Sequence, residues 1–207
     1  MIFHFDNYTL DIDIDRTRAF YARDDVKTIS KQCTCAGCRN YDKAILTEPA
    51  AVLDFLRSLG IDPGKPAEAF DVMGQLDENG MVWYNGFYHL CGVRLEGEGA
   101  WVNHAGGGCS RDENRMYVVD PSFKVSFEEK IYLLHEAFPT PVLQMEFDAR
   151  LPVALPDGYN YVPSAVYTVS QDKKGNVTVR EEDVQNWKDP LKADPHTPNP
   201  RPYTKGE

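Results

Sequence analysis

The chain has 207 residues, of which 42% are hydrophobic and 26% charged, and it carries a net charge of −10. These proportions indicate a folded globular protein and argue against a disordered or fibrous chain. The acidic excess repels phosphate backbones and anionic lipid surfaces, so we expect no nucleic acid and no membrane as partner. The sequence contains no apolar run long enough to span a bilayer and no signal-peptide pattern at its start. We therefore expect a cytoplasmic protein, with a protein or small-molecule partner that the sequence leaves open.

Three segments near the N-terminus carry periodic patterns. Residues 8–14 alternate apolar and polar side chains, which is typical of a half-buried strand. Residues 48–59 begin around Pro49, have apolar side chains at helical spacing and are followed by Gly60, a residue that caps helices. This pattern predicts a helix. A shorter helix is predicted over residues 39–46.

A β-meander is predicted in the next part of the chain. Asn85-Gly86 lies between apolar and aromatic runs, and this dipeptide is a strong hairpin signal because both residues tolerate the positive φ of a type I′ turn. The turn would place His89 and Cys91 on one face of the sheet, together with Phe87. The predicted strands are residues 69–76, 81–84 and 87–95.

The second half of the chain gives weaker signals. Residues 123–127 alternate as a strand, whereas Ser126 and Glu129 also match the capping box of a helix, so both alternatives stay open. The acidic pairs 128–129 and 181–182 are predicted to lie on solvated faces. Further strands are predicted at residues 115–119 and 142–149.

The composition changes after residue 156. Two short apolar runs, 165–169 and 177–180, flank a polar turn and predict a hairpin. The last segment contains five of the fourteen prolines and few large apolar groups, which is typical of an extended chain. We predict an α+β domain over residues 1–156, a hairpin appendage over 157–185 and a Pro-rich tail over 186–207.

Three of the five cysteines lie within six positions, in the sequence KQCTCAGCRNY. Cys35 and Cys38 have the two-residue gap of a zinc knuckle, in which a tight turn points both sulfurs at one ion. Cys33 supplies a third thiolate. Zinc prefers such ligands, whereas an iron–sulfur cluster usually requires four cysteines.

A closed zinc site needs a fourth ligand. The sequence has no second CxxC or HxxxH pair, so this ligand must come from elsewhere in the fold. Cys91, with His89 two residues before it, is the first candidate, and Cys109 or His104 is the next. The predicted metal site is Cys33, Cys35, Cys38 and Cys91, with zinc as the cofactor.

Two other interpretations of the thiols stay open. Reduced cysteine behaves as a small hydrophobe, so the three thiols can simply pack a loop before a helix. Alternatively, a helix that begins near Cys38 would lower the pKa of a thiol and so produce a reactive thiolate. The protein would then be a redox enzyme that uses Cys35 and Cys38.

Four segments resemble a family of uncharacterised bacterial proteins whose CxCxxCRNY motif lies near the N-terminus. The resemblance covers residues 8–156, and it implies a cytoplasmic single-domain protein without implying an activity. The segments are CTCAGCRNY at 33–41, LGIDPGKPAE at 59–68, NGFYHLCG at 85–92 and FPTPVLQMEFDARLP at 138–152.

Strands that follow one another without intervening helices predict an α+β fold. We expect a mostly antiparallel sheet with a β-meander and two or three helices packed against it. The expected function is that of a small binding or interaction module with a structural zinc site, and the alternative is a thiol-based redox enzyme.

Overall fold

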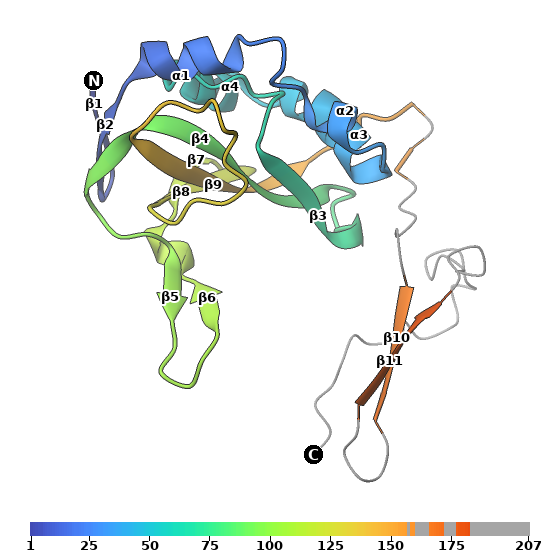
Figure 1. Cartoon of the computed structure of the whole chain (residues 1–207). Coiled ribbons are helices and arrows are strands. Elements are labelled where there is room, and N and C mark those ends of the chain that lie inside the picture. Colours follow the sequence, from blue (N-terminus) through green and yellow to red (C-terminus); the bar gives the residue numbers. More distant parts are fainter. Residues whose placement is uncertain (157, 160–165, 172–176, 183–207) are drawn as a thin grey trace. The chain divides into compact units, whose positions relative to one another are not determined.

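The computed structural model describes residues 1–156, 158–159, 166–171 and 177–182 (Figure 1). The chain divides into two units, Met1–Tyr161 and Val162–Glu207. Among the described residues of the first unit, seven strands form one antiparallel sheet and four α-helices lie along one side of it. The predicted α+β class and mostly antiparallel sheet are confirmed.

One long strand, β4 (Val82–Glu96), joins the parts of this sheet. Residues 82–91 pair with β9, residues 82–87 pair with β3, and residues 92–96 pair with β2. Strands β7, β8 and β9 follow one another as an antiparallel meander. The other strands of the sheet are β1 (Ile2–Phe5), β2 (Tyr8–Ile12), β3 (Glu68–Leu76), β7 (Tyr117–Asp120), β8 (Phe123–Glu128) and β9 (Val142–Leu151).

The predicted turn at Asn85-Gly86 is wrong, because both residues lie inside β4. A Cβ on Gly86 would overlap the carbonyl oxygen of Glu68 and lie 2.5 Å from Cζ of Phe147. Glycine is therefore required here by the close approach of two neighbouring strands, which is its other common role in sheets. The predicted meander at 69–95 is instead a single hairpin, with its turn at residues 77–80.

The helices cover the face of the sheet that carries the hydrophobic core. Tyr41 stacks on Phe147 with ring centroids 5.7 Å apart, and Phe123 stacks on the same ring at 5.6 Å. The Tyr41 and Tyr88 hydroxyls are 2.6 Å apart, and Tyr88 donates to the Pro63 carbonyl at 2.7 Å. The helices are α1 (Ile14–Tyr21), α2 (Ile29–Gln32), α3 (Ala36–Ala44), α4 (Ala50–Ser58) and the 3₁₀ turn η1 (Ile45–Thr47).

The helix predicted over residues 48–59 is confirmed as α4, and Gly60 follows it with a φ of +83°. The sequence pattern missed α1, because the alternation of residues 8–14 continues past the end of β2. The strand ends at Ile12, and the Asp13 side chain then accepts a hydrogen bond from the Arg16 backbone N–H at 3.0 Å. Asp13 is thus an N-cap rather than a strand residue.

The two alternatives for residues 123–138 are decided in favour of the strand, β8.

Two small hairpins complete the described residues. One is formed by β5 (Trp101–Asn103) and β6 (Cys109–Arg111), and it is followed by the 3₁₀ turn η2 (Glu113–Arg115). The other, in the second unit, is formed by β10 (Val166–Gln171) and β11 (Val177–Glu182). The predicted tail at 186–207 lies outside the described residues.

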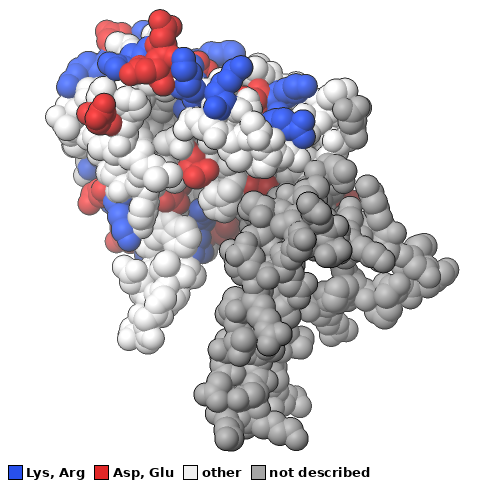
Figure 2. All heavy atoms as spheres, turned by 45° about the vertical axis from the view of Figure 1, so that its right-hand side comes forward, with Lys and Arg blue, Asp and Glu red and all other residues white. Residues whose placement is uncertain are grey.

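The side of the molecule drawn in Figure 2 carries lysines and arginines interspersed with aspartates and glutamates. The projecting hairpin β5–β6 carries no charged residue between Trp101 and Ser110. None of the helices described is both long and apolar enough to cross a bilayer.

Candidate metal centre

The structure brings the three clustered cysteines together where α2 ends and α3 begins. Cys33 is the C-terminal cap of α2, and Cys35 is the N-terminal cap of α3. The Sγ atom of Cys35 accepts a hydrogen bond from the backbone N–H of Cys38 at 3.4 Å. The three Sγ atoms all lie within 4.8 Å of one another. The two-residue gap therefore forms the tight turn that the spacing predicts.

The residues between and after the cysteines attach this turn to the sheet. Tyr84 donates a hydrogen bond to the carbonyl of Gly37 at 2.8 Å. The side-chain amide of Asn40 donates to the carbonyl of Pro152 at 3.0 Å and accepts from the backbone N–H of Ala154 at 2.8 Å. Because these contacts reach β4 and the end of β9, they hold the start of α3 in place.

Gly37 lies in van der Waals contact range of β3 and of the segment after β9. A Cβ at this position would lie 3.4 Å from the Tyr159 hydroxyl, 3.6 Å from Cβ of Asp71 and 3.8 Å from Sγ of Cys35. The turn thus packs closely against β3 and against the segment that follows β9. Tyr159 and Asp71 are themselves joined by a hydrogen bond between the hydroxyl and the carboxylate.

The three thiols differ in exposure and acidity. Cys33 and Cys35 are exposed, whereas Cys38 is buried. The backbone N–H of Cys35 and the neighbouring thiols lower the pKa of Cys33. Burial, together with hydrogen bonding to Cys33 and Cys35, raises the pKa of Cys38. In the absence of a metal, Cys33 therefore ionises more readily than Cys38.

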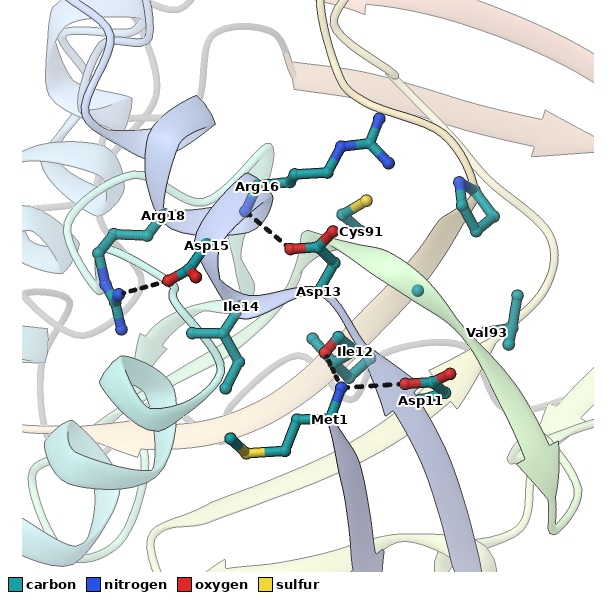
Figure 3. A pocket seen from close by; sticks show the side chains of 12 residues that line it. Met1, Asp11, Ile12, Asp13, Ile14, Asp15, Arg16, Arg18, Cys91 and Val93 are labelled. Atoms are coloured by element: carbon teal, nitrogen blue, oxygen red, sulfur yellow. Dashed lines mark hydrogen bonds and ion pairs between the residues drawn. The ribbon is translucent and has the colours of Figure 1, made fainter.

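The structure does not bring Cys91 to this cluster, which corrects the expected four-cysteine site. Cys91 is buried in β4, seven residues beyond Tyr84, and an extended strand covers about 20 Å over that distance. It lines a different cavity of about 590 Å³, beside Asp13 and Arg16 (Figure 3). The expectation failed because the spacing of the cysteines carries no information on where a distant strand passes relative to them.

The other proposed ligands are also bound elsewhere. Nε2 of His89 lies 3.0 Å from the Tyr132 carbonyl, and Nε2 of His104 lies 2.9 Å from the Ser110 hydroxyl. Cys109 is exposed at the start of β6. Among the described residues, Cys33, Cys35 and Cys38 are the one group of three or more candidate ligands whose donor atoms converge.

Two carboxylates of β3 border the cluster, and sequence reasoning missed both. Glu68 is close enough to Cys33 for its charge to oppose ionisation of that thiol. Asp71 packs against the turn at Gly37 and also accepts hydrogen bonds from the backbone N–H groups of Met73 and Gly74. Their proximity depends on the pairing of β3 with β4, for which the sequence near the cysteines carries no signal.

The arrangement suits a single metal ion. A tetrahedral zinc ion with Zn–S bonds near 2.3 Å keeps its sulfur ligands roughly 3.8 Å apart. The separations among Cys33, Cys35 and Cys38 are compatible with this value. Three thiolates would leave one coordination position of a tetrahedral ion for a further ligand.

Comparison of this chain with known protein families, with curated proteins and with solved structures finds no significant match. The resemblance to a bacterial family with the CxCxxCRNY motif therefore stays a prediction. The chemistry of the cysteine cluster has to be argued from its own geometry.

Proposed function

We propose that this chain is a zinc-binding module in which Cys33, Cys35 and Cys38 hold the ion. The observation that supports the proposal is the convergence of the three Sγ atoms within 4.8 Å of one another at the start of a helix. Soft thiolate ligands in a tetrahedral arrangement favour zinc over calcium or magnesium. The role of the ion is structural, since it ties the end of α2 to the start of α3.

The fourth ligand of this site is water or a donor from a binding partner. Cys33 and Cys35 are exposed, so water or a donor from a partner can reach an ion held by these thiolates. A partner that supplies a histidine or cysteine would complete the site and would be held by it. This arrangement fits the expected class of binding or interaction module.

Metal analysis of the full chain, purified without added metal, tests the proposal. We expect about one zinc ion per chain, since the three converging thiols would hold a single ion. Replacing Cys35 by Ser removes one of three thiolates and should abolish retention of zinc through gel filtration. The matched controls are Cys91→Ser and Cys109→Ser, which lie away from the cluster and should retain zinc.

Two results would contradict the proposal. The first is a zinc content below about a tenth of an equivalent in a folded protein to which zinc has also been added, since sites of this type bind tightly. The second is loss of zinc from Cys91→Ser to the same extent as from Cys35→Ser. That result would mean that the four-cysteine arrangement forms after all.

A second candidate function is thiol–disulfide exchange. Its supporting observation is that an exposed thiol, Cys33, lies within 4.8 Å of two others, one of which is in the first turn of α3. The Cys33 thiolate would attack a disulfide of a partner protein, releasing one partner thiolate and forming a mixed disulfide. Cys35 or Cys38 would then resolve it, releasing the second partner thiolate and leaving a disulfide in this chain.

Alkylation distinguishes the two functions. A zinc-bound cluster should react slowly with iodoacetamide until a chelator is added, because coordination occupies the thiolates. A thiol-exchange enzyme should react quickly with or without the chelator. Rapid alkylation of Cys33 in the zinc-loaded protein would therefore favour the second function.

A further inference from the structure

The face of the sheet opposite the hydrophobic core carries buried polar side chains. Alternation along β8 and β9 sends Phe127 and Phe147 to the core and the intervening residues to the other face. Glu128 and Glu146 lie on this second face, in diagonal positions, because Ser126 pairs with Glu146 and Glu128 pairs with Gln144. The buried polar residues of this face are His89, Ser126, Glu128, Gln144 and Glu146.

Two of these side chains, Glu128 and Glu146, border a cavity of about 730 Å³, which we call the carboxylate cavity. A single site for a small ligand has a similar volume. The hairpin β5–β6 and the segment after β8 contribute to its walls, so residues far apart in the sequence meet there. Its lining includes Phe87, Trp101, Arg111, Glu128, Tyr132 and Glu146.

Most charges around the carboxylate cavity are already paired. Glu146 accepts hydrogen bonds from Nε1 of Trp101 at 2.7 Å and from Arg111 at 3.3 Å. Arg94 pairs with Glu129 at 3.2 Å, and Arg115 pairs with Glu98 at 2.8 Å. Each arginine that lines the cavity is therefore paired with a carboxylate, whereas Lys130 lies over the Tyr132 ring.

Glu128 is the exception among the carboxylates. It is 8% exposed, and its Oε1 accepts hydrogen bonds from the Ala100 backbone N–H at 2.7 Å and from Ser126 at 2.9 Å. Within the part of the chain that the structure describes, no donor contacts its Oε2 and no cation forms an ion pair with it. A buried carboxylate without a counter-ion is costly, so this position favours a cationic ligand.

The backbone around Glu128 fits the carboxylate closely. A Cβ on Gly99 would overlap the Glu128 carboxylate, so glycine at this position lets the chain pass beside it. The approach is fixed by the hydrogen bond to Ala100 on the next residue. The position of the charge is therefore built into the fold and is not a result of side-chain mobility.

Aromatic rings form the apolar part of the cavity wall. Trp101 is 41% exposed and Tyr132 44% exposed, although both side chains are large. Arg111 lies 5.0 Å from the Trp101 ring centroid and Lys130 lies 4.9 Å from that of Tyr132, so both rings already stack with cations. Phe87, the residue of β4 that pairs with Glu146, contributes a third ring to the wall. Such rings bind both the carbon chain and the charge of an organic cation.

We propose that the carboxylate cavity binds an alkylammonium group, with Glu128 as its counter-ion and Phe87, Trp101 and Tyr132 around its carbon chain. A metal ion fits less well, because Glu128 and Glu146 do not belong to any convergent set of candidate ligands among the described residues. A free amine and a lysine side chain of a partner carry the same group. The site is independent of the cysteine cluster.

Isothermal titration calorimetry of the full chain tests this proposal with n-hexylammonium chloride and with hexan-1-ol, its neutral analogue of equal length. We expect saturable binding of the ammonium and binding of the alcohol that is at least about tenfold weaker, because only the ammonium pairs with Glu128. Nα-acetyl-lysine amide distinguishes the two sources: if it binds as tightly as hexylammonium the group belongs to a protein partner, and otherwise to a small amine.

Substitutions test whether Glu128 is the counter-ion of the bound ammonium group. Glu128→Gln keeps the shape of the side chain and should weaken hexylammonium binding by at least about tenfold. Glu78→Gln, in the exposed turn before β4, is the matched control and should bind like the unmodified protein. Trp101→Leu keeps Glu128 in place and should weaken binding by roughly threefold or more through loss of the ring.

Three outcomes would overturn the proposal. One is the absence of saturable hexylammonium binding, and another is equal affinity for hexan-1-ol, which would show an apolar cavity only. The third is unchanged affinity in Glu128→Gln. If Glu128→Gln does not fold, the comparison of the two ligands on the unmodified chain and the result for Trp101→Leu decide the question.

Discussion

The two faces of the same sheet serve different purposes. On the helix side, Tyr88 and Phe147 are fully buried, and the Tyr88 hydroxyl is bonded to Pro63 and Tyr41. On the other side, neighbouring residues of the same strands are His89 and Glu146, which are also buried but border two different cavities. Burial alone therefore does not mark the core. What distinguishes the second face is that its buried polar side chains lie beside cavities, and that one of them, Glu128, has no cation paired with it among the described residues.

The largest effect is expected on the helix side of the sheet. Replacing Phe147 by Ala removes a ring that stacks on Tyr41 and Phe123, and the cavity left behind should lower the free energy of unfolding by about 3–5 kcal/mol. Urea unfolding measures this change. Phe70→Ala is the control, because Phe70 is 51% exposed and should cost less than about 1 kcal/mol. Equal losses in the two variants would contradict the assignment of the core to the helix side.

A pH-dependent effect is expected on the opposite face. Burial lowers the pKa of His89 to about 4, so the folded protein excludes a proton that the unfolded chain binds below pH 6.5. Stability should therefore fall as the pH decreases from 6.5 to 4, by roughly 3 kcal/mol from this group. His89→Gln should remove this part of the pH dependence, as measured by thermal unfolding across the range. His4→Gln, on the exposed strand β1, should retain it, and retention in His89→Gln would refute the assignment.

The smallest effect is expected from the buried hydroxyl pair. Tyr88 donates to the Pro63 carbonyl, so Tyr41 is the donor between the two hydroxyls. Tyr41→Phe removes one hydrogen bond and should cost about 1 kcal/mol. Tyr88→Phe leaves both the Tyr41 hydroxyl and the Pro63 carbonyl without their partner and should cost more, about 1–3 kcal/mol. Chemical denaturation of the two single variants gives the order, and the reverse order would mean that the donor direction is different.

Local features of the chain were predictable. The helix over residues 50–58 follows from its apolar spacing and from Gly60, and the convergence of Cys33, Cys35 and Cys38 follows from their spacing around a tight turn. These features depend on residues a few positions apart, and backbone geometry fixes the relation between them. Their prediction needed no knowledge of the rest of the fold.

Features that depend on strand register were not predictable. Asn85-Gly86 has the composition of a turn, but Phe147 and Glu68 crowd Gly86 from neighbouring strands, and this contact is visible only once the strands are paired. The expectation for Cys91 failed for a related reason, because the position of a strand relative to a distant cysteine cluster also depends on strand pairing.

The environment of Glu128 illustrates the same limit. Alternation along β8 correctly separates Glu128 from Phe127, and a charged residue on that alternate face was expected to be solvated. The expectation was wrong because the chain at Gly99 and Ala100 covers this face. Alternation states which residues share a face, but it does not state whether another segment covers that face.

The length of β4 affects how the protein opens to solvent. Its 15 residues bond to β2 near one end and to β3 and β9 near the other, so no neighbouring strand can detach without exposing amides of this one strand. Amide hydrogens of β4 should therefore exchange through global opening of the first unit, whereas those of the small hairpin β5–β6 exchange through local fraying. A ligand that binds beside β5–β6 would slow that fraying first, before it changed the exchange of the central strand.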